Sequence, residues 1–207
     1  MLSVMHASRG IKTTVYSQHS SLLAYGFNMT WVVAVESGFD YFAMIHADIG
    51  APAHWLSDMV DMMEAEKAEV VSAVVPIKDD SFTVSTAWDR GDDAVRLTYD
   101  EVRGLPATFS AEDLGEKIAP ENKGLLVNTG LWVAKLGRDW NRKFTGFRIN
   151  TGIYWDRKAV WVEPEDWEFS RQMNRMGEKI MATSAVKVQH TGKMVWNIPG
   201  SRSGEEA

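Results

Sequence analysis

An apolar segment in the first quarter of the chain ends in two polar side chains whose types could bind a cation. Residues 41–45 have the composition of a buried strand, and His46 and Asp48 follow before a break at residues 50–52. Side chains two residues apart on an extended chain project to the same side, so an imidazole and a carboxylate could share one ion or one hydrogen-bonding ligand. The alternative is an ordinary strand end with a capping aspartate. These residues alone do not decide between the two.

Three further polar residues stand at the ends of predicted elements later in the chain. Glu165 and Asp166 begin a predicted helix, and His190 follows the last predicted strand. Acidic residues in a first helical turn are favoured by the helix dipole and need no catalytic role. A single histidine after a strand is more often a surface or hydrogen-bonded residue than a metal ligand. None of these residues establishes a site by itself.

Length and composition fit a single globular domain. A chain of 207 residues can bury a full core, and we expect one domain over residues 1–200 with a polar tail at 201–207. The net charge of −6 argues against a general nucleic-acid binder, although a metal ion could still hold a phosphate. The absence of cysteine excludes disulfides, cysteine-zinc sites and thiol catalysis. With no apolar run of membrane-spanning length and no recognisable signal peptide, a cytoplasmic location is the expectation.

The order of the predicted elements indicates an α/β sheet. Strand-like runs at residues 13–16, 41–49 and 70–77 alternate with amphipathic helical patterns at 20–36 and 53–67. Alternation of strand and helix favours parallel pairing, so the sequence predicts a mostly parallel central sheet flanked by helices. In such a sheet, ligands bind outside the carboxyl ends of the strands, which is where His46 and Asp48 stand.

The middle of the chain is more polar and less regular. Residues 82–88 and 95–99 fit a hairpin, and a clear strand follows at 125–134. Thr129 and Gly130 interrupt this strand. A glycine at such a position indicates a bulge or a close approach of the backbone to a ligand.

A segment rich in arginine, lysine and aromatic residues follows at 137–160. A mobile or solvated loop is the favoured interpretation, and a basic lid over a diphosphate is the alternative. A helix that begins near residue 163 and a strand-like run at 179–188 complete the pattern.

Taken in order, these motifs resemble those of the GT-A-fold nucleotide-sugar glycosyltransferases, particularly the compact family-2-like enzymes. The segment Tyr41-Phe-Ala-Met-Ile-His-Ala-Asp48 is similar to the family's strand that ends in Asp-x-Asp. Asp48 stands at the second acidic position, whereas His46 replaces the first carboxylate.

Three other segments contribute to the resemblance. The pair Glu165-Asp166 resembles the family's Glu-Asp motif, and Gly177 followed by a strand and His190 resembles its closing glycine, strand and metal-binding histidine. Ser21-Leu-Leu-Ala-Tyr-Gly-Phe-Asn28 resembles a stretch that often reads Ser-Leu-Ile-x-x-x-Arg-Asn, but Phe27 stands where a basic residue is expected.

The resemblance implies a fold, a metal and a base. The fold is a single GT-A-like, Rossmann-like α/β domain. Asp48 and His190 would hold Mn²⁺ or Mg²⁺ with the donor diphosphate, and His46 could help because imidazole also binds manganese. Asp166 takes the position of the general base that deprotonates an acceptor hydroxyl, and Glu165 would orient it or the acceptor.

The resemblance also implies residues that contact the donor or acceptor. An indole ring can stack on the face of a sugar, and nine tryptophans slightly favour ligands with flat apolar faces. Besides His46 and Asp48, the predicted contact residues are Asn28, Asn128, Thr129, Gly130 and Trp132. His6, Ser8 and Arg9 are added as nucleotide contacts from their position alone, because they follow the first strand-like run, at residues 2–5.

The function implied is a metal-dependent hexosyltransferase, which moves a sugar from a nucleoside-diphosphate donor to a glycan or another hydroxyl acceptor. One alternative is a sugar-phosphate nucleotidyltransferase, which would usually show a glycine-rich phosphate loop with a lysine near the first strand. Ser8-Arg9-Gly10 is a poor version of that loop. The other alternative is a degenerate, non-catalytic module that binds a nucleotide sugar, which the replacement of a carboxylate by His46 would suit.

Overall fold

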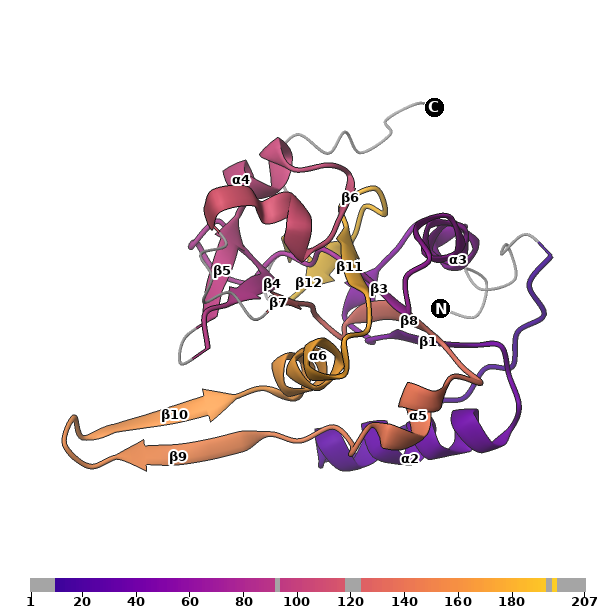
Figure 1. Cartoon of the computed structure of the whole chain (residues 1–207), viewed down its shortest axis with the longest axis horizontal. Coiled ribbons are helices and arrows are strands. Elements are labelled where there is room, and N and C mark those ends of the chain that lie inside the picture. The colour runs from indigo at the N-terminus through magenta and orange to yellow at the C-terminus, as the bar shows by residue number, and fades with distance from the viewer. Residues whose placement is uncertain (1–9, 92–93, 118–123, 193–194, 197–207) are drawn as a thin grey trace.

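The structure is a computed structural model that describes residues 10–91, 94–117, 124–192 and 195–196 (Figure 1). Its helices are α2 (Leu23–Glu36), α3 (Trp55–Glu66), α4 (Tyr99–Gly104), the 3₁₀ segment η1 (Ala111–Lys117), α5 (Asp139–Lys143) and α6 (Glu165–Met176). The strands are β1 (Tyr41–Ile45), β2 (Ile49–Gly50), β3 (Val70–Ala73), β4 (Thr83–Asp89), β5 (Ala94–Thr98), β6 (Thr108–Phe109), β7 (Gly124–Leu126), β8 (Leu131–Lys135), β9 (Asn150–Tyr154), β10 (Ala159–Glu163), β11 (Ile180–Thr183), β12 (Gln189–Thr191) and β13 (Val195–Trp196).

The central sheet is mixed, so the prediction of a mostly parallel sheet is wrong. Its strand order is β1-β8-β3-β11-β6, and among the described strands only β3 and β11 pair in parallel. β8 pairs antiparallel with both β1 and β3, and β6 pairs antiparallel with β11. The alternation of strand and helix does make β1 and β3 run in the same direction. It does not reveal that β8, from much later in the chain, lies between them and makes most of the pairings antiparallel.

Three smaller sheets surround the central one. β4 pairs with β5 and β7, β12 pairs with β2 and β13, and β9 and β10 form a separate hairpin. All of these pairings are antiparallel. In Figure 1 the β9–β10 hairpin extends away from the body of the protein, directly before α6.

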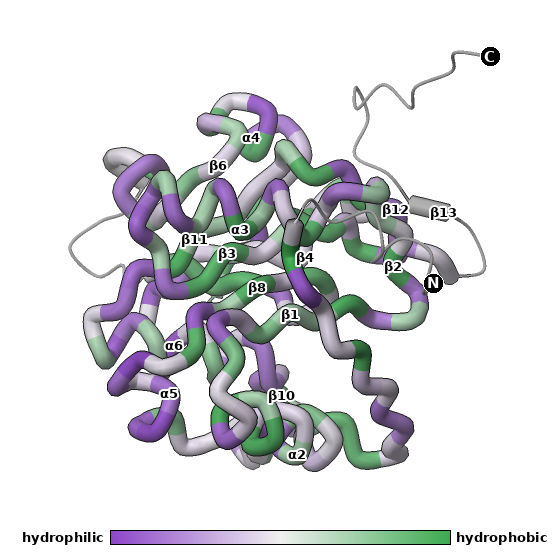
Figure 2. The backbone as a smooth tube through the Cα atoms, turned by 90° about the vertical axis from the view of Figure 1, so that its right-hand side faces the viewer, coloured by the Kyte–Doolittle hydropathy of each residue, from purple (hydrophilic) through white to green (hydrophobic). Residues whose placement is uncertain are grey.

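Alternate residues of the central strands face two separate cores, as the period of two in a strand requires. Phe42, Val70 and Trp132 belong to the core beneath α2 and α6, whereas Val71 and Val133 belong to the core beneath α3. Figure 1 shows α3 on one side of the sheet and α2 and α6 on the other. Figure 2 shows hydrophobic residues along β3 and β8, near the centre of the molecule. The helices therefore hold the sheet, and the ends of its strands, in place.

Aromatic rings fill the core between α2, α6 and the sheet. The indole of Trp31 lies at its centre, with its ring centroid 5.4 Å from that of Trp140 and 6.1 Å from that of Trp132. It also contacts three phenylalanine rings: Phe42, Phe144 and Phe147. The tryptophan content of the chain thus serves core packing to a large extent.

Two local predictions from the sequence are corrected by the structure. Residues 13–16 form no strand, since no neighbouring strand in the described part of the chain pairs with them. The segment 137–160 is not simply a solvated loop. It contains α5 and most of the β9–β10 hairpin, and its aromatic side chains Trp140 and Phe144 are buried in the core.

Replacing Trp31 with alanine tests the aromatic core. We expect Trp31→Ala to lower the free energy of unfolding by about 3–5 kcal/mol, because a large buried ring leaves a cavity among its neighbours. The matched control is Trp155→Ala, since this side chain is 81% exposed. Urea unfolding followed by circular dichroism measures both. A change below about 1 kcal/mol for Trp31→Ala would contradict the packing described.

Candidate functional site

Three distant segments of the chain meet where β1 ends and β8 begins. We refer to this row of strand ends as one edge of the central sheet. β1 ends there with His46 and Asp48, and β8 begins there after Asn128 and Gly130 because it runs in the opposite direction. The backbone N–H of His46 donates to the carbonyl of Gly130 over 2.8 Å, and the N–H of Thr191 donates to the carbonyl of Asp48 over 2.8 Å. The mixed sheet therefore brings together the residues that the sequence marked separately.

Asp48 has two polar neighbours at this edge. Its Oδ2 forms an ion pair with Nζ of Lys78, and the same oxygen lies 3.6 Å from Nε2 of His190. Partial burial raises the pKa of Asp48, but the hydrogen bond and charge of Lys78 outweigh this effect and hold the pKa below its ordinary value. Asp48 is thus an anion at neutral pH.

The second neighbour, His190, has a ring orientation that suits a metal ligand. Its Nδ1 lies 2.8 Å from the carbonyl oxygen of Pro76, which can only accept, so Nδ1 carries the hydrogen. In the neutral ring, Nε2 then directs its lone pair toward Asp48. A carbonyl that fixes the tautomer in this way is the usual outer partner of a metal-bound histidine.

The pair formed by Asp48 and His190 fits one divalent cation. Ligand atoms 3.6 Å apart can both bind an ion at about 2.0–2.2 Å, and magnesium commonly uses few protein ligands beside water and phosphate oxygens. The described residues contain no group of three or more histidine, aspartate or glutamate side chains arranged for a metal. His46, Asp48 and His190 therefore do not form a three-ligand site. Water and diphosphate oxygens would have to supply the remaining ligands.

His46 occupies a more enclosed position than Asp48. Burial lowers the pKa of its imidazole, and its ring packs against Phe27 with centroids 5.4 Å apart. Nε2 of His46 is buried and has no hydrogen-bond partner among the described residues. A buried polar atom without a partner is uncommon and marks a position that a ligand could satisfy.

Asp166 lies at the first turn of α6 and reaches the same edge through Asn128. Nδ2 of Asn128 donates to Oδ2 of Asp166 over 3.2 Å, and Oδ1 of Asn128 accepts from the N–H of Gly130 over 2.6 Å. The hydroxyl of Ser72 on β3 donates to the carbonyl of Asn128 over 2.5 Å. This chain of contacts joins the start of α6 to the strand ends beside His46.

The carboxyl group of Asp166 has a strongly shifted pKa. Burial and the charge of Glu165 raise the pKa to about 7, although the N–H of Trp167, the charge of Arg96 and the amide of Asn128 oppose the shift. Burial also raises the pKa of Glu165. A carboxyl group that titrates near neutral pH is suited to accept and release protons.

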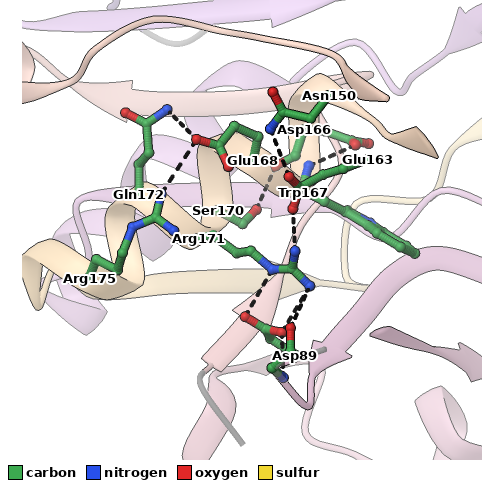
Figure 3. Close-up of polar contacts among 11 residues, drawn as sticks. Asp89, Asn150, Glu163, Asp166, Trp167, Glu168, Ser170, Arg171, Gln172 and Arg175 are labelled. Carbon is green, nitrogen blue, oxygen red and sulfur yellow. Dashed lines mark hydrogen bonds and ion pairs between the residues drawn. The ribbon is translucent and has the colours of Figure 1, made fainter. Parts of the chain in front are cut away.

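A partly buried ion network holds α6 against the neighbouring strands. The guanidinium of Arg171 forms two hydrogen bonds with Asp89 at the end of β4, at 3.0 and 3.1 Å, and an ion pair with Glu163 at the end of β10. Nδ2 of Asn150 on β9 donates to Glu163 over 2.8 Å. Figure 3 shows Arg171 between Asp89 and Glu163. The network connects the base of the β9–β10 hairpin to the sheet that contains β4. It thereby holds Glu163, which lies just before Asp166, in place.

The other predicted contact residues are engaged by neighbouring residues, are buried, or lie outside the described residues. Nδ2 of Asn28 donates to the carbonyl of Phe147, and Oδ1 of Asn28 accepts from the N–H of Phe147. These hydrogen bonds connect α2 to the chain before β9. Trp132 is fully buried among aromatic rings, which leaves no indole face for a sugar, and Thr129 is also buried. The remaining positions, outside the residues that the structure describes, are His6, Ser8 and Arg9.

Sequence reasoning missed Lys78 and Arg171 as parts of the site. Lys78 directly follows the apolar run 70–77, which was a usable signal because β3 ends at the same edge as β1. Arg171 carries no comparable signal, since its partners Asp89 and Glu163 come from two segments whose packing the sequence does not reveal.

No family model, curated protein or solved structure matches this chain. Across the described ranges, no helix is long and apolar enough to cross a membrane.

The raised pKa of Asp166 predicts a pH dependence of stability. A pKa of about 7 in the folded protein exceeds the ordinary value of 3.8, so the folded state binds more protons between these values, and stability falls as pH rises from about 4 to 7. The contribution is on the order of 1 kcal/mol per pH unit. We expect Asp166→Asn to remove this pH dependence. The free energy of unfolding of the variant, relative to that of wild type, should therefore be higher at pH 8 than at pH 4.5.

Urea unfolding across this pH range measures the effect. Asp61→Asn, at an exposed position on α3, is the control that leaves the slope unchanged. If the free energies of unfolding of wild type and Asp166→Asn changed with pH in the same way, the prediction would be wrong, because Asp166 would then have an ordinary pKa.

Proposed function

We propose that this protein transfers a sugar from a nucleoside-diphosphate donor to a hydroxyl acceptor with the help of a divalent cation. The observation that carries the proposal is that Asp48 and His190, which suit a cation, and Asp166, which suits a general base, are joined through Asn128 and Gly130 at one sheet edge. Sugar transfer needs these two functions close together. The resemblance of the motif order to GT-A glycosyltransferases supports the same reaction.

Asp48 and His190 would hold Mn²⁺ or Mg²⁺ together with the donor diphosphate. When bound, the cation supplies positive charge that stabilises the departing diphosphate. The fixed tautomer of His190 and the ionised carboxylate of Asp48 provide one nitrogen and one oxygen ligand without rearrangement of the backbone.

Asp166 would remove the proton from the acceptor hydroxyl as its oxygen attacks the anomeric carbon. Oδ1 of Asp166 accepts from the N–H of Trp167 over 2.8 Å, and the amide of Asn128 holds Oδ2, so the orientation of the carboxylate is set before the acceptor binds. A base with a pKa near 7 is largely ionised at slightly alkaline pH and still basic enough to take a proton. Glu165 raises this basicity through its charge.

Replacing the base tests the catalytic assignment. After a panel of nucleotide sugars with Mn²⁺ identifies the donor and a matched acceptor, we expect Asp166→Asn to lower kcat by about 10²–10⁴-fold. Binding of the donor with Mn²⁺ should remain within about threefold of wild type, because Asp166 is outside the cation pair. The wild-type kcat/KM should rise with pH and level off above about 7. Full activity of Asp166→Asn would exclude this residue as the base.

Replacing Asp48 tests the cation assignment independently of turnover. We expect Asp48→Asn to weaken Mn²⁺-dependent binding of the donor at least about tenfold by calorimetry, because the amide is neutral and a poorer cation ligand. Asp61→Asn, at an exposed position on α3, is the control. Unchanged binding by Asp48→Asn would remove the cation from this position.

A further inference from the structure

Lys78 places a positive charge on the candidate cation site. Its Nζ forms an ion pair with Oδ2 of Asp48, which is the oxygen that lies 3.6 Å from Nε2 of His190. In the neutral ring, Nε2 of His190 and Oδ2 of Asp48 are both acceptors that face each other, an arrangement that a cation between or beside them stabilises. In the structure, the ammonium group of Lys78 provides that cation beside Asp48.

The backbone around Lys78 is held firmly while its side chain can move. The N–H of Ile77 donates to the carbonyl of Thr83 over 3.1 Å, Pro76 forms a bridge with Val84, and the carbonyl of Pro76 accepts from His190. The Lys78 side chain itself is 32% exposed and carries its charge on a flexible four-carbon stem. The ammonium group can therefore leave Asp48 without a change in the backbone.

The charges favour such a movement when a diphosphate arrives. Lys78 and Asp48 together are neutral, so a divalent ion that enters alone loses the attraction of a free carboxylate and meets a like charge a few ångströms away. A diphosphate adds negative charge on oxygens next to the ion. Lysine is a common phosphate ligand and can reach these oxygens from its present position beside a ligand of the ion.

We propose that Lys78 is a phosphate-binding residue that neutralises Asp48 in the free protein and transfers its ammonium group to the diphosphate when cation and donor bind together. This inference rests on the proposed function, because it assumes that a cation with a diphosphate is the ligand. If Lys78 acts in this way, the site binds a divalent cation weakly when the cation is alone and more tightly when a diphosphate binds with it. Lys78 thereby links occupancy by the cation to occupancy by the donor.

Calorimetry with Lys78→Met tests this linkage without any sugar or turnover. The probes are Mn²⁺ alone and Mn²⁺ in the presence of inorganic pyrophosphate, at low ionic strength where charge effects are least screened. We expect Lys78→Met to bind Mn²⁺ alone about tenfold or more tightly than wild type does. We also expect pyrophosphate to increase the affinity for Mn²⁺ about tenfold less than it does in wild type, because the phosphate contact is lost.

Two further variants act as controls. Lys78→Arg keeps the charge and should stay close to wild type in both measurements. Lys179→Met removes a comparable exposed ion pair, with Glu66 at 3.4 Å, and should change neither affinity. Circular dichroism confirms that each variant is folded.

Asp48→Asn separates failure of this inference from failure of the proposed function. Suppose that Asp48→Asn loses the binding of Mn²⁺ with pyrophosphate, while Lys78→Met binds Mn²⁺ with wild-type affinity both with and without pyrophosphate. The proposed role of Lys78 is then wrong, whereas the cation site at Asp48 is supported. If Asp48→Asn binds Mn²⁺ with pyrophosphate as tightly as wild type does, the cation site is misplaced and the inference about Lys78 is wrong as well. Tighter binding of Mn²⁺ by Lys78→Met, with weaker enhancement by pyrophosphate, supports the proposal.

Discussion

The hydrogen bonds of Asn128 are the interaction on which the candidate site depends most. This residue lies just before β8, and its amide joins the carboxylate of Asp166 to the backbone of Gly130, while its carbonyl accepts from Ser72. Gly130 in turn holds the backbone of His46. One polar side chain thus connects the start of α6 with the start of β8, and through Gly130 with the end of β1.

The insertion of β8 between β1 and β3 makes this junction possible. Because β8 runs against both neighbours, its first residues lie beside the last residues of β1. A parallel strand in the same position would start at the opposite edge. The antiparallel pairing that overturned the predicted sheet is therefore also the reason that residues from the two halves of the chain meet.

The sequence predicted local elements and marked polar positions better than it predicted contacts between them. The apolar periodicity identified α3, which buries one face, and a continuous apolar run identified β1, of which only Phe42 is fully buried. The same periodicity could not show that Trp132 faces the core, since a strand buried on both faces has no polar side. Nor could it reveal the pairing of Arg171 with Asp89, 82 residues away, which depends on how two sheets pack.

The position of a bound cation is the most direct test of the proposed site. Crystals grown with Mn²⁺ and pyrophosphate would locate the ion by its anomalous scattering. We expect one manganese ion about 2.0–2.3 Å from an oxygen of Asp48 and from Nε2 of His190, with diphosphate oxygens completing its coordination and no contact between the metal and Asp166. A manganese ion bound elsewhere, or a pyrophosphate held away from Asp48, would contradict this expectation.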